Sequence, residues 1–203
     1  MRTARRGSTR RRLGLAGAAA GLATMAVTAA AVGTSASAAG LDPVAYVTGA
    51  PYCGITWGSL AKTAEHPTTA QVTGVRSGQH RCFDRLVIDL NGPRSGYSVQ
   101  YVDQVVEDGS GRAIAVNGGA RLQVSVNAPD YDLNGHRVYR PNDAAHVVDV
   151  AGYRTFRQVV YAGSFEGYTS FGLGVRARLP FRVFTLTGPG NGSRVVIDVA
   201  HRW

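Results

Sequence analysis

Two aspartates and an asparagine at alternate positions form the clearest chemical motif in this sequence. Asp130, Asp132 and Asn134, followed by Gly135, match the first half of an EF-hand calcium loop, D-x-D-x-N-G. The second half does not match, because position twelve is Pro141 in place of a bidentate glutamate, and no flanking helix is predicted. The motif leaves two interpretations open: a weak calcium site formed by these three side chains, or an ordinary Asn-Gly turn at the surface.

Catalytic residue types are present, but their spacing matches no known catalytic arrangement. The chain has no G-x-S-x-G nucleophile elbow, and its carboxylates fall mostly in turns and at strand ends, with no pair placed to face one glycosidic bond. The histidines show neither H-x-H nor H-x-x-x-H spacing, so a metal site would combine ligands from distant strands. We expect no catalytic residue, no metal centre and no cofactor. The histidines are His66, His80, His136, His146 and His201.

One predicted strand, Ser170 to Leu179, has an arrangement suited to binding. Its apolar residues alternate toward a core, which leaves two glycines and two arginines facing outward as a flat floor ending in guanidinium groups. The preceding turn adds aromatic surface and a carboxylate, and the combination fits a glycan with acidic groups. In a simpler interpretation, Glu166 pairs with Arg176 across the hairpin and the glycines only make room for a loop. The predicted ligand-binding residues are Phe165, Glu166, Tyr168, Gly172, Gly174, Arg176 and Arg178.

The elements that position these residues are predicted to be strands. From Cys82 to Leu90 the aliphatic residues point to one face and their charged neighbours to the other, the period-two pattern of a strand with one face in a core. Ser193 to Val199 repeats the order Arg, aliphatic, Val, Ile, Asp, aliphatic. We interpret the two stretches as related core strands, although any two β-rich strands flanked by charges would share these features.

Short strands with glycine-rich turns between them continue through most of the chain. Spaced at about 8 to 12 residues, they predict an all-β fold, an antiparallel β-sandwich or barrel with few helices. The one helical element expected is a single turn after Ser59. Strands are predicted at 72–76, 79–90, 97–106, 113–116, 121–126, 155–162, 169–179, 181–186 and 194–200.

Residues 1–39 have the composition of a secretion signal. Six arginines precede the uncharged run from Leu13 to Val32, and the small residues Ala36-Ser37-Ala38 follow. We expect cleavage near Ala38-Ala39 after general or twin-arginine export; the arginine pattern fits the latter only loosely. No cysteine precedes Cys53, so no lipid anchor is expected, and no later apolar run reaches the roughly 20 residues that cross a bilayer. These features predict a secreted protein with a leader at 40–69, a folded domain at 70–203 and no stable membrane insertion.

The charge and the cysteine content bear on the binding partner and on the state of the two thiols. Without the six signal arginines, 16 Lys and Arg remain against 13 Asp and Glu, a net charge of +3 that argues against a nucleic-acid partner. Cys53 and Cys82 are expected to pair in an oxidising compartment, because a zinc site would need further ligands. The bond would close a loop of about 30 residues and stabilise the fold by about 3.6 kcal/mol in the chain-entropy model. It would also hold Trp57 against the strand that carries Leu86 and Ile88.

Several stretches together resemble the AMIN-like domain of actinobacterial secreted proteins and lipoproteins. The resemblance spans about residues 50–203 and rests on 80–90, 163–167, 171–176, 180–183 and 194–199. It implies a β-sandwich of two similar sheets, with which the near-repeat at Arg85 and Arg194 agrees. The chain differs from better-known members in having no amidase domain behind the sandwich, and from the lipoprotein members in lacking a lipid-bearing cysteine.

The resemblance implies a secreted, non-enzymatic module that binds or targets the cell envelope. Its expected partner is a cell-wall glycan, such as peptidoglycan, or an envelope protein. A hydrolase of envelope polymers with an unrecognised active site is the alternative. Convergence of two carboxylates, or of a serine and a histidine, in one pocket would favour that alternative.

Overall fold

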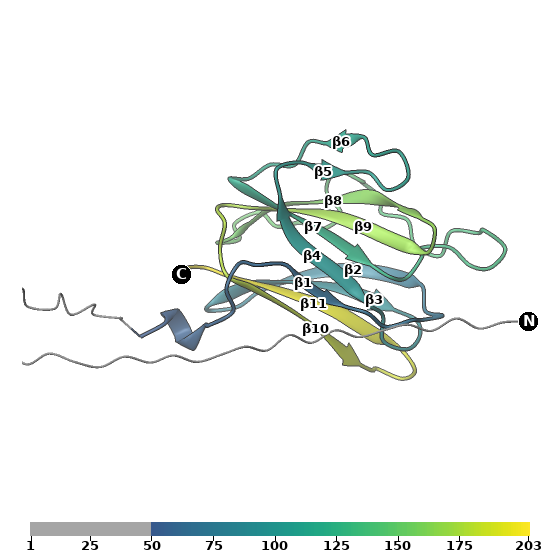
Figure 1. Ribbon diagram of the computed structural model, residues 1–203, viewed down its shortest axis with the longest axis horizontal. Helices are drawn as coiled ribbons and strands as arrows, with labels where there is room; N and C mark the ends of the chain where they lie inside the picture. The colour runs from purple at the N-terminus through teal and green to yellow at the C-terminus, as the bar shows by residue number, and fades with distance from the viewer. Residues whose placement is uncertain (1–49) are drawn as a thin grey trace, which may run out of the picture. The chain divides into compact units, whose positions relative to one another are not determined.

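The structure, a computed structural model, describes residues 50–203 (Figure 1). The predicted secretion signal, its cleavage site and the first part of the leader lie outside the described residues. The remainder folds as strands, with one short 3-10 turn, η1, at Tyr52–Gly54.

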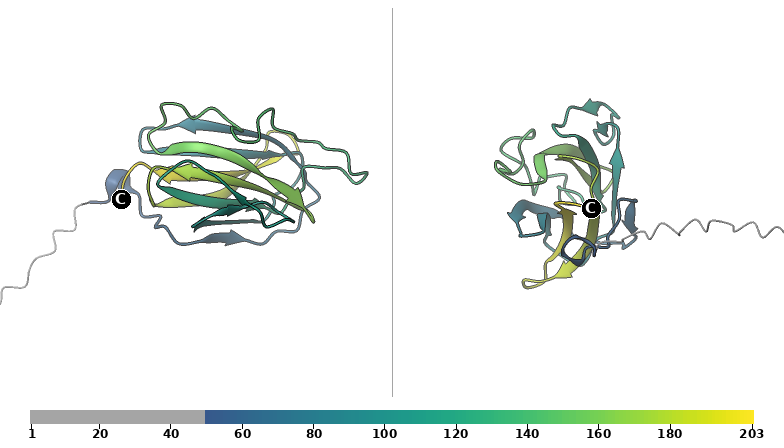
Figure 2. Two further views of the ribbon diagram at one scale, coloured as in Figure 1. Left: turned by 90° about the horizontal axis from the view of Figure 1, so that it is seen from above. Right: turned by 90° about the vertical axis from the view of Figure 1, so that its left-hand side faces the viewer.

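Two antiparallel sheets pack face to face, which confirms the predicted all-β sandwich (Figures 1 and 2). The five-stranded sheet has the order β1-β4-β7-β9-β8, and the four-stranded sheet has the order β10-β11-β3-β2. Strands β5 and β6 form a small separate hairpin. The strands are β1 Lys62–Ala64, β2 Val72–Gln79, β3 Phe83–Leu90, β4 Tyr97–Val102, β5 Val105–Val106, β6 Ala113–Ile114, β7 Ala120–Val126, β8 Phe156–Phe165, β9 Tyr168–Val175, β10 Phe181–Thr187 and β11 Ser193–Ala200.

The core lies between the two sheets and is built from the inward side of each strand. Leu86 and Ile88 of β3 are fully buried opposite residues of the other sheet such as Phe171 and Leu173. Burial of each such side chain contributes about 1.5–3 kcal/mol relative to leaving it exposed. The alternation read from the sequence therefore places the inner face of β3 correctly.

Some predictions of local structure were wrong. The single strand predicted at 97–106 is two strands, β4 and β5, because the chain bends at 103–104 and β5 pairs with β6. The helical turn expected after Ser59 is absent, and the chain there forms β1 at Lys62–Ala64, paired with β4. Strand β9 ends at Val175 and not at Leu179, because residues 176–180 cross from one sheet to the other. The apolar alternation continues through this crossing because its side chains also pack on the core, with Leu179 only 3% exposed.

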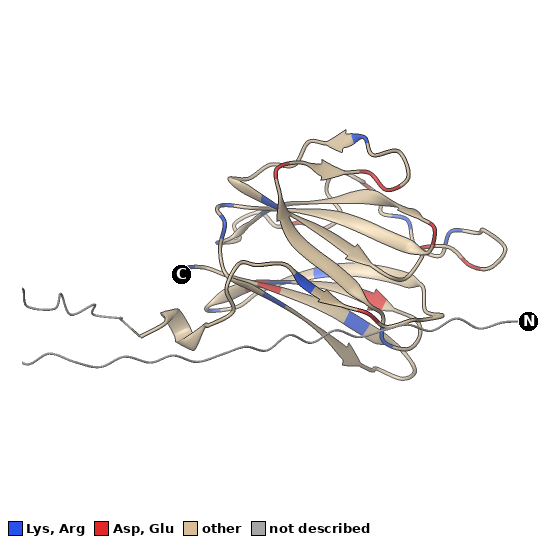
Figure 3. Ribbon diagram, in the orientation of Figure 1, with Lys and Arg blue, Asp and Glu red and all other residues tan. Residues whose placement is uncertain are grey.

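The two near-identical stretches lie side by side in one sheet, and not one in each sheet as the implied symmetry suggested. Strands β3 and β11 pair antiparallel, so that Arg85 stands opposite Asp198 and Asp89 opposite Arg194. The repeated order of charges therefore brings opposite charges together twice along one ladder. Figure 3 shows basic and acidic residues on this sheet.

The predicted disulfide between Cys53 and Cys82 is confirmed, with Cα atoms 6.2 Å apart. It ties η1 to the start of β3, and the Phe181 amide donates to the Gly58 carbonyl at 2.8 Å farther along the leader. Trp57 packs edge-on against Phe83, with ring centroids 5.6 Å apart. Trp57 therefore lies against the predicted strand, on the outer side of β3, and Leu86 and Ile88 lie on the inner side.

Replacing both Cys53 and Cys82 by Ser is expected to lower the free energy of unfolding by up to about 3.6 kcal/mol, because the unfolded chain regains the freedom of the open loop. Denaturant unfolding of the wild-type and double-Ser proteins measures the difference. Mass spectrometry of the wild type after thiol alkylation should detect no modified cysteine. Two alkylated thiols in protein purified under oxidising conditions would contradict the bond.

Candidate binding surface

The open glycine floor predicted on β9 does not exist. Gly172 and Gly174 are buried, because residues 103–119, which include β5 and β6, fold over the outer face of the five-stranded sheet. A Cβ on Gly172 would come within 3.0 Å of Val105 and Val160, and one on Gly174 would overlap the Asn117 carbonyl. The glycines make room for this covering segment, the simpler of the two interpretations drawn for them from the sequence.

The other predicted residues separate to the two ends of β9. Phe165 and Tyr168 are about half exposed at the β8–β9 turn, where Glu166 has a φ of 48°. Arg176 and Arg178 lie beyond the other end of the strand, roughly 25 Å away at about 3.3 Å per residue. The seven residues therefore do not form one surface.

Both arginines beyond β9 are engaged with backbone groups of the same end of the sandwich. Arg176 donates to the carbonyl of His201. Arg178 donates to the Ser59 carbonyl at 3.1 Å and lies 4.9 Å from the centroid of the Tyr101 ring. Glu166 forms no ion pair with any residue in 50–203, so the simpler interpretation is right about the glycines and wrong about a Glu166–Arg176 pair.

The half calcium loop is held by bonds within the protein. Asp130 is fully buried and accepts from Arg137 at 2.6 Å and from the Tyr161 hydroxyl at 2.5 Å. Burial, followed by the bond to Asp130, raises the pKa of Tyr161 well above its ordinary value, so the hydroxyl keeps its proton. Asp132 caps the turn by accepting from the amides of Asn134 and His136. Asp130 and Asp132 thus serve different partners, and residues 50–203 contain no cluster of three His, Cys, Asp or Glu able to hold a metal.

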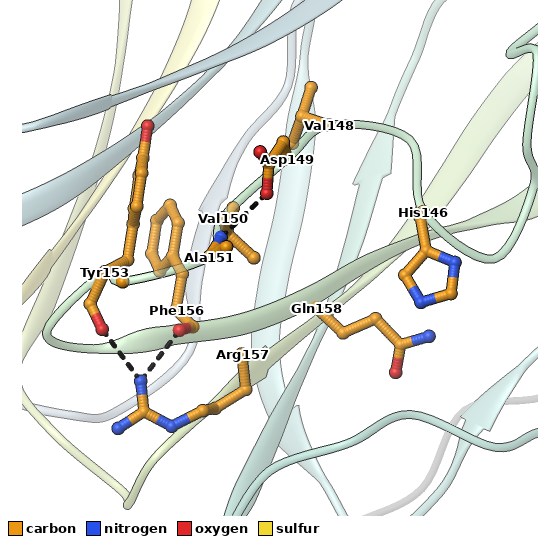
Figure 4. A pocket seen from close by; sticks show the side chains of 10 residues that line it. His146, Val148, Asp149, Val150, Ala151, Tyr153, Phe156, Arg157 and Gln158 are labelled. Carbon is orange, nitrogen blue, oxygen red and sulfur yellow. Dashed lines mark hydrogen bonds between the residues drawn. The ribbon is translucent and has the colours of Figure 1, made fainter.

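A hollow of about 680 Å³ lies beside β8 and does not gather reactive groups (Figure 4). Asp149 accepts from the Ala151 amide at 2.8 Å, and Arg157 donates to the carbonyls of Tyr153 and Phe156. These polar side chains therefore hold the loop that forms the wall. This hollow and four others lined by residues 50–203 each lack a pair of carboxylates and a serine with a histidine.

The outer face of the four-stranded sheet carries a different constellation, centred on a buried carboxylate. Asp198 of β11 is fully buried although it points away from the core. It accepts from Arg85 of β3 at 2.6 and 2.9 Å, and from Arg182 of β10 at 2.9 Å. Both arginines stay partly open to solvent, with side chains 25% and 41% exposed. One carboxylate therefore fixes two guanidinium groups at the surface.

Aromatic rings surround these two guanidinium groups. The Arg182 guanidinium lies 4.5 Å from the centroid of Trp57, 5.0 Å from that of Phe184 and 5.6 Å from that of Phe83. The Arg85 guanidinium lies 5.3 Å from Phe83 and 5.6 Å from Phe184. We call this set, Trp57, Phe83, Arg85, Arg182, Phe184 and Asp198, the guanidinium platform.

The platform has one net positive charge and a rigid geometry. The hydrogen bond to Asp198 raises the pKa of Arg85 above its ordinary value. Each arginine uses its Nε and Nη2 groups on the carboxylate, and within residues 50–203 the Nη1 groups have no partner. Such a surface can donate hydrogen bonds to carboxylates or hydroxyls while its rings stack on a flat apolar face.

Sequence reasoning missed the platform because its members come from four separated segments, the leader, β3, β10 and β11. In the sequence, Arg85 and Asp198 belong to the two predicted core strands, and Arg182 lies in the stretch 180–183. The available signal was the repeated Arg and Asp order in β3 and β11, which the antiparallel register turns into an ion pair. Trp57 reaches the site only through the leader that the disulfide holds.

Comparison with known proteins gives one positive finding. A family model described as the AMIN-like domain matches residues 70–201. No significant match was found among curated proteins or among solved structures. None of the helices formed by residues 50–203 has the length and apolar character needed to span a membrane.

Replacing Gly174 by Ala is expected to lower the free energy of unfolding by at least about 2 kcal/mol, because the new methyl group overlaps the Asn117 backbone. Gly78→Ala is the matched control on β2, where the nearest atom to a Cβ is 3.9 Å away, and it should change stability by less than about 1 kcal/mol. Thermal and denaturant unfolding compare the two. Equal stability of both variants would mean that the segment 103–119 does not lie against β9.

Replacing Asp198 by Ala is expected to cost about 3 kcal/mol of stability, because Arg85 and Arg182 then face each other without a counter-charge. Asp89→Ala removes a more exposed pair with Arg76 in the same sheet and should cost at most about 1 kcal/mol. Denaturant titrations of both variants provide the comparison. A cost for Asp198→Ala no larger than that for Asp89→Ala would contradict a structural role for the buried carboxylate.

Proposed function

The chain belongs to the AMIN-like domain family, and from this premise we propose that it binds an acidic glycan of the cell wall through the guanidinium platform. Domains of this family are cell-envelope binding modules that typically act in extracellular or periplasmic space. The finer assignment concerns the surface and the chemistry of the ligand. The observation that supports this proposal is the pair of guanidinium groups that Asp198 holds between three aromatic rings.

The composition of the platform favours a sugar polymer with isolated negative charges. Pyranose rings present flat apolar faces that stack on Trp and Phe side chains, and their hydroxyls accept hydrogen bonds from guanidinium groups. A peptide carboxylate or a lactyl group on such a polymer would meet the single net positive charge. Polyphosphate ligands such as nucleic acids demand a more extended basic patch than two arginines that share an aspartate.

Pre-organisation supports binding at this surface. The bidentate bond to Asp198 and the stacking of Arg182 on Trp57 already restrict rotamers that a ligand would otherwise have to order. Ordering one such long side chain costs about 0.5–1.5 kcal/mol on association. A shallow surface can therefore bind a repeating polymer with useful affinity, since each repeat offers the same contacts.

The hydrolase alternative has no residue constellation to support it within residues 50–203. The hollow beside β8 uses its polar side chains to hold its own wall, and the hydrogen-bonded pair of Asp84 and His201 is only 0% and 4% exposed. A substrate could not reach that pair without opening the fold. The observations therefore favour binding over hydrolysis, and turnover assays on the same polymers test the choice.

The direct test is co-sedimentation of the secreted protein with purified cell walls. Arg182→Gln and Trp57→Ala are each expected to weaken wall binding by about tenfold, because one removes a charged donor and the other a stacking face. Arg140→Gln is the matched control, since Arg140 is exposed in the loop between β7 and β8 and lies outside the platform. Thermal unfolding of each variant confirms that loss of binding is not loss of fold.

Wall preparations distinguish the ligand sources. Walls stripped of phosphate polymers should retain the protein if peptidoglycan is the ligand, and binding should fall as salt rises because one or two exposed charges contribute. Undiminished retention of both platform variants would place the binding surface elsewhere. Retention of none of the proteins on any wall preparation would remove the proposal itself.

A further inference from the structure

Three of the four sheet edges in the sandwich offer little backbone for pairing with another chain. Two are lined by other segments of the chain, and the third is a strand of only three residues. The edge of β8 is covered by residues 144–147, where the Tyr161 amide donates to the Ala144 carbonyl at 2.7 Å and the Val147 amide to the Val159 carbonyl at 2.9 Å. Strand β1 consists of three residues and carries Lys62. Short strands, charges and covering loops are the devices by which proteins prevent edge-to-edge pairing.

The β2 edge is lined by the loop before β8, which bonds to side chains of the strand and not to its backbone. A register shift between Val72 and Gly74 also interrupts this edge. The Gln79 side chain donates to the Gly152 carbonyl at 3.1 Å, and the Ser77 hydroxyl bonds with the Tyr153 hydroxyl at 3.1 Å. The Val72 amide donates to the Pro129 carbonyl at 2.8 Å at the start of the strand. The four-stranded sheet is therefore protected on this side.

Strand β10, the other edge of that sheet, is protected only over its first half. Its even-numbered residues bond to β11, as the bonds from Ala200 to Pro180 and from Gly188 to Gly192 on either side show. The odd-numbered residues consequently direct their backbone groups outward. The Phe181 amide meets the Gly58 carbonyl, and the Val183 carbonyl accepts from the Tyr97 hydroxyl at 3.1 Å.

The second half of β10 has open backbone groups. No atom of residues 50–203 bonds to the outward amides of Val183 and Thr185 or to the Thr185 carbonyl. The strand Phe181–Thr187 contains no acid, lysine, proline or glycine, and Leu186 is 38% exposed. Figure 1 and the right-hand view in Figure 2 show β10 as the outermost strand of its sheet. Within residues 50–203, no loop lines this half of the β10 edge.

We infer that β10 pairs antiparallel with β10 of a second copy of this chain, about a twofold axis at Thr185. In this register the Thr185 residues exchange their open amide and carbonyl bonds, and Val183 faces Thr187 of the second copy. Phe184 then faces Leu186 of the second copy at a closely spaced position, and the twofold axis repeats the contact. The exposed apolar side chain of the strand is thereby covered by an apolar partner.

The charges on the strand select a second copy in this orientation. The two Arg182 residues are separated by six strand positions, roughly 20 Å at about 3.4 Å per residue, so they do not repel at contact range. A shift that brought them opposite each other would place like charges together. The strand pattern is self-complementary around Thr185. A closed dimer therefore gives the open backbone groups of β10 hydrogen-bond partners.

Such a dimer joins the two outer sheet faces into one surface. A twofold axis through an antiparallel strand pair runs perpendicular to the sheet, so both guanidinium platforms face the same side of an eight-stranded sheet. This consequence rests on the proposed function, because it makes the dimer bivalent toward a wall polymer. Two linked sites bind a repeating ligand far more tightly than one.

Sedimentation velocity of the secreted protein across a concentration series measures the association. The wild type is expected to shift toward twice the chain mass as concentration rises, and Leu186→Lys to raise the dimer dissociation constant by at least about tenfold through loss of the apolar contact and repulsion at the edge. Leu133→Lys is the matched control, because Leu133 is fully exposed in the loop between β7 and β8. Equal association of wild type and Leu186→Lys, or a monomer at every concentration, would overturn the dimer.

Single cysteines test the register. Under mild oxidation Thr185→Cys is expected to form a covalent dimer, because a twofold axis at that residue brings the two Cα atoms to about 5.5 Å. Thr187→Cys should not, because its opposite neighbour is Val183. Cross-linking of Thr187→Cys alone would overturn the register. A monomer that still binds walls would overturn the dimer and leave the proposed function of the platform intact. A dimer that binds no wall would support the dimer and overturn the proposed function.

Discussion

The antiparallel pairing of β3 with β11 is the constraint on which the rest of the structure depends. These strands lie 113 positions apart at Arg85 and Asp198 and form the centre of the four-stranded sheet. Their inner side chains, including Leu86, Ile88 and Ile197, fill the core, and their outer side chains assemble the platform. A slip of one residue would turn every side chain of one strand to the wrong face, so the core and the surface charges fix the same register.

Two carboxylates at neighbouring positions of this ladder have opposite tasks. Asp198 points outward and neutralises two arginines. Asp84, opposite Val199, is buried and accepts from the amides of Thr155 and Phe156 at 2.6 and 3.1 Å and from His201 at 2.9 Å. Asp84 thereby ties the start of β3 to the start of β8 in the other sheet. A buried carboxylate is tolerated only when its charge and lone pairs are satisfied, so these bonds are as restrictive as the apolar packing.

The sequence was sufficient to predict the features of the fold that depend on local residue patterns. Alternation and turn chemistry predicted most of the strands, the sandwich and the inner face of β3, and the cysteine count predicted the bond from Cys53 to Cys82. It was insufficient where one segment covers another. The glycines of β9 have the pattern of an open surface, and only the fold shows residues 103–119 lying on them. Trp57 and Arg182 likewise become neighbours through tertiary contacts that no spacing in the chain announces.

Glycan binding by the platform is tested most directly by nuclear magnetic resonance titration of the purified protein with soluble cell-wall fragments. The indole N–H signal of Trp57 and the Nε–H signals of Arg85 and Arg182 report on the platform without any substitution. We predict that these signals shift first and saturate together as the fragments are added. Shifts confined to the β8–β9 turn at Phe165 and Tyr168, with the platform signals unmoved at saturation, would contradict the account.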